Sequence, residues 1–334
     1  MAAKTRKRTA SAAEKERRRR ERVEQVEQLR AQLAEQVEQL VTSGGWARML
    51  AAARSLHRYS LRNQLLIMVQ AAERGFEPSH VAGYRAWQAM GRQVRKGQRG
   101  LRILAPCLVW VDLAEGEALP SNVVKVEQTA KGRRAQVRRF RPTSVWDVSQ
   151  TDGIGDEDTP DAPTVAEPAA AADDPEALAA LRDELGEQVE AAGFTLRYGD
   201  PGLGRLGVTI YTDRLVIVDN THGAAEQVGT LAHELAHITL GHEDHTAHDR
   251  KSRREIEAES VAYIVLGAHG IDAPTSASYV TAYAEGDVEE VLAAAERVTE
   301  AARQILDQGE ADETGEQDTK TDEQTRAGAE AVAA

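Results

Sequence analysis

An acidic, proline-rich stretch in the middle of the chain is the feature that most limits how these 334 residues can fold. Residues 151–175 hold eight Asp and Glu, no Lys or Arg, and four of the ten prolines. A segment without periodic apolar residues has no surface to bury, so it is expected to stay extended. The chain is therefore predicted to form two domains of ordinary size on either side of a linker at residues 154–175.

Both domains are predicted to be of the α+β class. The first domain, residues 43–153, mixes helical spacing with strand patterns such as LRILAPCLVWVDL. The second domain, residues 176–308, places alternating strand patterns between apolar segments of helical period. Outside them, residues 1–42 form a basic, partly disordered extension with an amphipathic helix, and residues 309–334 form a disordered acidic tail.

The composition places the protein in a reducing compartment and away from the membrane. The single cysteine, Cys107, excludes a disulfide within the chain. No apolar run approaches the roughly 20 residues that a membrane helix needs, and charge stands where a signal peptide would be apolar. A cytoplasmic, soluble protein without a membrane partner is expected.

The stretch LAHELAHITLGHEDH, residues 231–245, has the spacing of a metal site. In a helix, residues four apart share a face, so His233 and His237 can direct their imidazoles at one ion. Glu234 lies beside that face, where its carboxylate reaches a water on the metal. Two neutral nitrogen ligands with a neighbouring general base are the arrangement that HExxH encodes for Zn²⁺.

A catalytic zinc needs a third protein ligand, and Glu255 is the best candidate for it. Glu255 and Glu259 lie four apart in the helical pattern REIEAESVAY, so one carboxylate can bind the metal while the other orients a histidine. Glu259 is also the alternative ligand. The competing interpretation is a solvated helix face in which HExxH arises by chance. His242, His245 and His248, which follow the helix, are expected to be ordinary loop residues and not metal ligands, because His233, His237 and Glu255 already fill the protein positions of a catalytic zinc.

A second charged stretch points to a polyanionic partner. Residues 43–150 hold 18 Lys and Arg against 7 Asp and Glu, and GRQVRKGQRGLRIL carries the densest cluster. Arginines beside glycines can neutralise a phosphate chain, and aromatic rings can stack on unpaired bases. The competing interpretation is a solvated basic hairpin with its tryptophans in the core. The candidate nucleic-acid-binding residues are Arg92, Arg95, Lys96, Arg99, Arg102, Tyr84 and Trp87.

Both stretches resemble known families. TLAHELAHITLGH followed by EIEAESVAY is similar to the ImmA/IrrE group of gluzincin metallopeptidases. SLRNQLLIMVQ, VAGYRAWQAMGRQVRKGQRGLRIL and FRPTSVWDVSQTDG resemble, in this order, the N-terminal single-stranded-DNA-binding domain of ArdC-type antirestriction proteins. The first resemblance implies a zincin-like fold with Glu255 as the third ligand and Glu259 as its support. The second implies single-stranded DNA as a partner.

Two functions follow from these motifs. The first is a single-stranded-DNA-binding protein with a zinc-dependent metallopeptidase that cleaves an unidentified protein substrate, in an antirestriction, stress or mobile-element role. The second is a DNA-binding protective factor whose metal site is structural or vestigial. The sequence leaves both open, because a site that has lost catalysis keeps its ligands.

Overall fold

The computed structural model describes residues 12–40, 43–114, 118–120, 122–129, 132–154, 174–243, 250–272 and 288–307. Its residues divide into two compact units, Met1–Gln39 with Arg62–Val165, and Leu40–Leu61 with Ala166–Ala334. Each unit contains both helices and strands, which confirms the α+β class. The start of the predicted extension, most of the predicted linker and the acidic tail lie outside the described residues. In the described part of the chain, no helix is long and apolar enough to cross a membrane.

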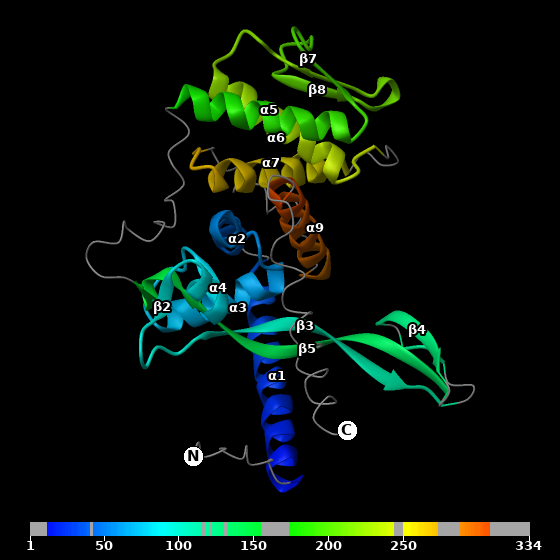
Figure 1. Ribbon diagram of the computed structural model, residues 1–334. Helices are drawn as coiled ribbons and strands as arrows, with labels where there is room; N and C mark the ends of the chain where they lie inside the picture. The colour runs from blue at the N-terminus through cyan, green and yellow to red at the C-terminus, as the bar shows by residue number, and fades with distance from the viewer. Residues whose placement is uncertain are drawn as a thin grey trace, which may run out of the picture. The chain divides into compact units, whose positions relative to one another are not determined.

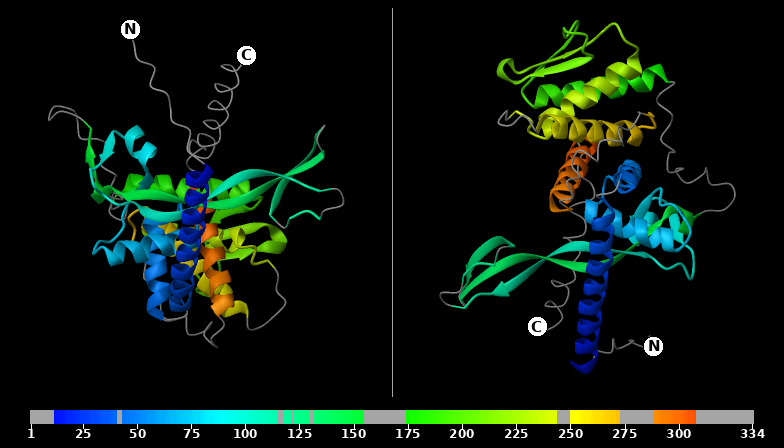
Figure 2. Two further views of the ribbon diagram at one scale, coloured as in Figure 1. Left: turned by 90° about the horizontal axis from the view of Figure 1, so that it is seen from below. Right: turned by 180° about the vertical axis from the view of Figure 1, so that it is seen from behind.

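A long antiparallel ribbon organises the first unit (Figures 1 and 2). β3 (Leu101–Asp112) pairs with β5 (Gly132–Asp147) in an unbroken register. β4 (Val123–Thr129) pairs with β5 at one end of the ribbon, and helices α3 and α4 lie beside the other end. The other elements are α1 (Ala12–Leu40), α3 (Leu61–Glu73), β1 (Val81–Gly83), α4 (Tyr84–Ala89), β2 (Arg92–Val94) and β6 (Thr151–Gly153).

Two side-chain amides from α3 complete the open edge of β3, which is the last strand of its sheet. Asn63 donates to the Leu104 carbonyl at 3.2 Å and accepts from the Leu104 amide at 2.9 Å. Gln70, two helical turns later, makes the same pair of bonds with Arg102, both at 2.8 Å. The amides therefore take the place of a neighbouring strand and satisfy backbone groups that the edge would leave unpaired.

The second unit has a small sheet over layers of helices (Figure 1). The sheet has the order β7-β9-β8, with β7 and β9 parallel and β8 antiparallel to β9. Helices α5 and α6 pack together, and α7 packs against α6. The elements are α2 (Ser43–Leu56), α5 (Pro175–Ala191), β7 (Thr195–Tyr198), β8 (Gly207–Ile210), β9 (Leu215–Val218), α6 (Ala224–Thr239), α7 (Arg250–Ala268) and α9 (Val288–Asp307).

Helix α2 belongs to the second unit although it stands near the start of the chain. Its Arg54 lies over the Tyr263 ring, 5.3 Å from the centroid, and forms an ion pair with Asp272 at 3.2 Å. Gly267 makes this contact possible, because a Cβ there would lie 1.9 Å from Arg54 Nε. Each predicted domain is one continuous segment of the chain, whereas the second compact unit also includes Leu40–Leu61 from the N-terminal part. Which segments fold independently stays a prediction.

The amides on the β3 edge predict a measurable loss of stability. Asn63→Leu keeps the branched shape of the side chain but leaves the Leu104 amide and carbonyl without their side-chain partner, which costs about 1–3 kcal/mol in the free energy of unfolding. Urea unfolding of the full chain measures the change. Gln88→Leu, an exposed amide on α4, is the control and should shift the midpoint little. Equal midpoints for both variants would contradict the assigned role of Asn63.

Candidate metal centre

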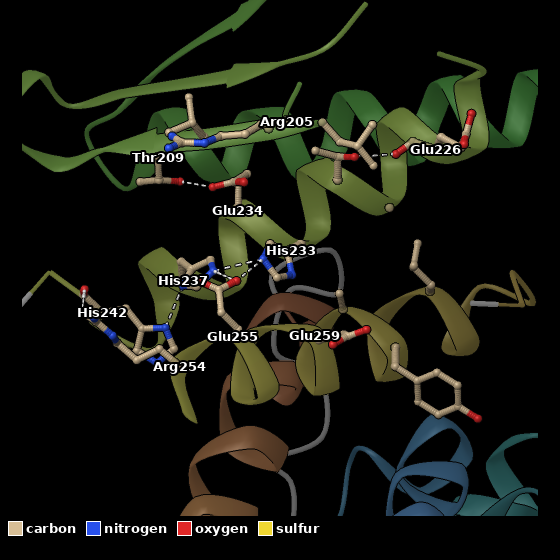
Figure 3. A pocket seen from close by; sticks show the side chains of 18 of the residues that line it. Arg205, Thr209, Glu226, His233, Glu234, His237, His242, Arg254, Glu255 and Glu259 are labelled. Atoms are coloured by element: carbon tan, nitrogen blue, oxygen red, sulfur yellow. Dashed lines mark hydrogen bonds and ion pairs between the residues drawn. The ribbon is translucent and has the colours of Figure 1, made fainter. Parts of the chain in front are cut away.

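Helix α6 carries two of the metal-binding candidates and is fixed by the apolar face beside them. Gly223 precedes it, and its backbone amide donates to Glu226 in the first turn at 3.4 Å. The buried side of the helix is formed by Val228, Leu231, Ala232, Leu235 and Ala236. As the spacing predicts, this burial leaves the HExxH histidines on the side of α6 that meets α7 (Figure 3).

The three predicted donors come together in one cluster (Figure 3). The Nε2 atoms of His233 and His237 are 3.0 Å apart, and they lie 3.5 and 3.6 Å from Oε2 of Glu255. Zinc bonds of about 2.0–2.1 Å at tetrahedral angles place ligand atoms about 3.3 Å apart. The cluster therefore fits a tetrahedral zinc ion in both donor type and spacing, with a fourth position left for water or substrate.

Glu234 is held by a hydrogen bond from the sheet and is not part of the three-residue cluster of metal-ligand candidates. Its Oε2 accepts a hydrogen bond from the Thr209 hydroxyl of β8 at 2.6 Å, and the residue is only 7% exposed. Gly207, also on β8, lies so near that a Cβ there would be 2.9 Å from Oε1 of Glu234. Thr209 thus fixes one carboxylate oxygen and leaves the other able to take a proton. Thr209 carries no sequence signal, because only the fold places it opposite α6.

A chain of polar contacts supports His237 from behind. Its Nδ1 lies 2.9 Å from Nδ1 of His242, whose Nε2 lies 3.3 Å from Oε2 of Glu257. Glu257 in turn accepts from Arg297 of α9. If His237 binds metal through Nε2, its Nδ1–H donates to His242, which then donates through Nε2–H to Glu257. Gly241, at φ 68°, ends α6 in the left-handed conformation that brings His242 back under the helix.

The expectation that His242 is an ordinary loop residue is therefore wrong. It is 7% exposed and contacts a candidate ligand, although it does not join the cluster of donors. The sequence placed it five residues after His237, beyond the i+4 spacing of a helix face, so helical periodicity could not reveal it. His245 and His248 lie outside the described residues.

The local charges prepare these groups for a cation. Hydrogen bonds from His233 and His237 hold the pKa of Glu255 well below its usual range, so it is ionised at neutral pH. Burial acts to lower the pKa of His233, but the hydrogen bond to Glu255 and nearby carboxylates raise it overall. Burial lowers the pKa of His242, which favours the neutral form that its two contacts require. A metal ion here competes with a proton on His233.

The remaining carboxylate of the prediction, Glu259, lines the same pocket one turn further along α7 (Figure 3). It is outside the three-residue cluster, and its charge helps to raise the pKa of His233. Tyr211 also lines the pocket, but its hydroxyl donates to the His237 carbonyl at 3.0 Å. Glu259 therefore acts on His233 through its charge. Its predicted role of orienting a metal ligand stays a prediction.

The predicted nucleic-acid residues divide into two groups. Lys96, Arg99 and Arg102 have exposed side chains on or beside the β2–β3 loop. Arg92 instead donates to the Thr151 hydroxyl at 2.8 Å, and Arg95 pairs with Asp152 at 3.2 Å, so both hold β2 against β6. Arg95 is exposed as well but pairs with Asp152, whereas Lys96, Arg99 and Arg102 have no ion pair within the described residues and can contact a phosphate chain.

The two aromatic candidates also separate. The Trp87 ring is 0% exposed and its Nε1 donates to the Trp146 carbonyl at 2.9 Å, so it cannot stack on a base and serves the core. This corrects the prediction, and the competing core interpretation holds for this residue. Tyr84 is exposed, and its hydroxyl accepts from Gln93 at 2.6 Å. Gly100 serves internal packing as well, since a Cβ there would lie 2.8 Å from Cβ of Ser144.

Comparison with known proteins agrees with both motifs. Residues 12–146 match the family described as the N-terminal domain of anti-restriction factor ArdC. Residues 187–280 match the family described as the IrrE N-terminal-like domain, a peptidase family by its name. The second segment contains all three donors of the cluster. These matches confirm the two resemblances that the motifs indicated.

Two solved structures are similar to the chain along most of its length. The antirestriction ArdC protein from the R388 plasmid, in its metal-free structure, is 22% identical with a TM-score of 0.45, covering 81% of this chain and 96% of that one. Its Mn(II)-bound structure is 21% identical with a TM-score of 0.39, covering 75% of this chain and 88% of that one. No curated protein matches the chain.

The contact between His237 and His242 predicts that His242 affects how tightly the three-residue cluster would bind a divalent metal ion. His242→Ala removes the group that orients His237, and loss of such a group costs about 10- to 100-fold in metal affinity. Competition with a chromogenic chelator near neutral pH measures the zinc dissociation constant. His242→Gln keeps a polar partner and should recover part of the loss. His222→Ala changes a histidine that does not line the pocket and is the control. Affinity unchanged in His242→Ala would rule out this role.

Proposed function

Because the chain joins an ArdC-type N-terminal domain to an IrrE N-terminal-like domain, we propose that it is an antirestriction factor with two activities. Its first unit binds single-stranded DNA, and its second unit is a zinc-dependent metallopeptidase. The observation that carries the enzymatic part is the triangle of His233, His237 and Glu255 with the Glu234 carboxylate held beside it.

The roles of the residues follow from their positions. Zinc bound by the three donors would polarise a carbonyl and lower the pKa of a coordinated water to about 7. Glu234 is placed to act as the general base, and would accept a proton from a water molecule beside the three donors and deliver it to the leaving amine. Thr209 keeps the carboxylate oriented through both transfers, because its hydrogen bond occupies one oxygen only. Glu255 would hold the cation together with His233 and His237, and its negative charge would offset part of the charge of the ion.

The pocket supports an extended peptide as the substrate. It has a volume of about 950 Å³ and is lined by residues of β8, α6 and α7. β8 pairs only with β9 among the described strands, so its other edge borders the pocket with unpaired backbone groups. A peptide chain can add to such an edge and place a carbonyl near the donors.

Substitution of the proposed general base, Glu234, distinguishes a metallopeptidase from a protein whose metal site is structural. Glu234→Gln should retain zinc, because Glu234 is not a donor, and should lower cleavage of a peptide library by about 10²- to 10⁴-fold. Mass spectrometry of the digested library and metal analysis measure the two properties. Glu226→Gln changes another acid of the same helix and pocket and should cleave normally.

Protection of DNA from restriction in cells completes this experiment. If Glu234→Gln holds zinc and protects as well as the unchanged protein, the peptidase is not the antirestriction activity. The protein is then a DNA-binding protective factor with a structural metal site. Parallel loss of cleavage and protection supports the proposed enzyme.

The DNA-binding part of the proposal rests on the exposed group in the first unit. Lys96, Arg99 and Arg102 project from a short segment whose backbone is fixed to β5 and α3. Cations held at fixed spacing neutralise successive phosphates and release counterions, which makes binding strongly dependent on salt.

Charge reversal tests this surface. The Lys96→Glu, Arg99→Glu double variant should bind an oligothymidine at least about tenfold more weakly, with a salt slope smaller by about 1.4, since each lost contact on a single strand contributes about 0.7. Fluorescence anisotropy across a salt series measures both. The control is Arg182→Glu with Arg197→Glu, two bases of the second unit. A double variant that binds like this control would refute the assignment.

A further inference from the structure

The β3–β5 ribbon has two chemically different faces. Because its register is unbroken, residues directly opposite each other share a face, and successive residues alternate. Leu108 lies opposite Arg138, and Pro106 lies opposite Phe140. We define the Phe140 face by Arg102, Leu108 and Trp110 of β3 and Arg138 and Phe140 of β5. The opposite face carries Val109, Cys107, Arg139 and Arg141.

The Phe140 face exposes apolar side chains that belong to no core. Phe140 is 57% exposed and Leu108 is 46% exposed. The opposite face, in contrast, is buried at both ends of the ribbon. At the end of the ribbon beside α3 and α4, the opposite face carries the buried Leu101 and Ile103. At the end beside β4, it carries Val137, which belongs to a small buried cluster. The exposed ring is therefore not explained by folding of the first unit.

Arginines surround these apolar side chains. Residues 132–141 of β5 contain five Arg and no acid. On the Phe140 face, Arg134 lies over the Trp110 ring at 4.3 Å and pairs with Glu127, whereas Arg138 is exposed and has no ion pair within the described part of the chain. Arg102, one of the exposed cations of the β2–β3 loop region, lies on this face at the root of the ribbon.

We propose that the Phe140 face of the β3–β5 ribbon is a binding surface for single-stranded nucleic acid and extends the contact that begins at the β2–β3 loop. An exposed ring between cations fits unpaired bases, which stack on aromatic faces while their phosphates meet arginines. Duplex DNA offers the phosphates but keeps its bases stacked inside. The proposal rests on single-stranded-DNA binding by the first unit and assigns a second part of that surface.

Because successive side chains point to opposite faces of the ribbon, neighbouring residues provide matched controls for the test. Phe140→Ala and Arg138→Gln change the proposed face, while Val109→Ala and Arg139→Gln make similar changes on the opposite one. All four side chains are exposed, so melting temperatures should stay close to that of the unchanged chain. Anisotropy of a labelled oligothymidine with the full chain, repeated with a duplex of equal length, measures binding.

We expect Phe140→Ala to raise the dissociation constant for the single strand at least about fivefold, as loss of a stacked base does. Arg138→Gln should reduce the salt slope by about 0.7, and both controls should change little. Four variants that bind as the unchanged chain does would overturn the proposal. Equal effects of Arg138→Gln and Arg139→Gln with Phe140→Ala silent, or equal binding of the duplex, would overturn it too.

The Lys96→Glu, Arg99→Glu variant, measured in the same series, separates this proposal from the proposed function. If that variant binds weakly while the four ribbon variants bind normally, the first unit binds DNA without the ribbon. If the unchanged chain does not bind the single strand at all, both fail together.

Discussion

The packing of α6 against α7 is the contact on which the metal centre depends. α6 supplies both histidines from one face, but a helix face alone gives two ligands and no closed geometry. The third donor comes from α7, which packs against α6. This packing brings Oε2 of Glu255 within 3.6 Å of Nε2 of both histidines.

Residues that are not metal-ligand candidates fix the positions of the side chains in the candidate metal centre. Thr209 fixes Glu234 from the sheet side, and His242 fixes His237 from the opposite side. The first unit uses the same means at a different place, where Asn63 and Gln70 hold the edge of β3. In each case a buried or half-buried polar side chain provides a hydrogen-bond partner for a group that has lost water, and this fixes the position of that group.

The prediction from sequence was best where the chemistry follows helical spacing. His233 and His237 were found because four-residue spacing places them on one helix face whatever the tertiary fold. Glu255 was a candidate beside Glu259, and the structure places Glu255 in the cluster with the histidines. The prediction was wrong for Trp87, because the sequence pattern of an aromatic residue near arginines is the same whether the ring is buried or exposed. It also missed His242, whose position depends on the reversal at Gly241 and not on a period.

The sequence by itself determined the α+β class, the acidic stretch in the middle of the chain and the two histidines proposed as metal ligands, because these follow from composition and local period. Only the tertiary structure decided that α2 joins the second unit, that Glu257 and Arg297 stand behind His242, and which ribbon face exposes Phe140. Those outcomes depend on contacts between residues far apart in the chain. Local patterns carry no information about such contacts, because the free energy that selects them arises only when the elements pack.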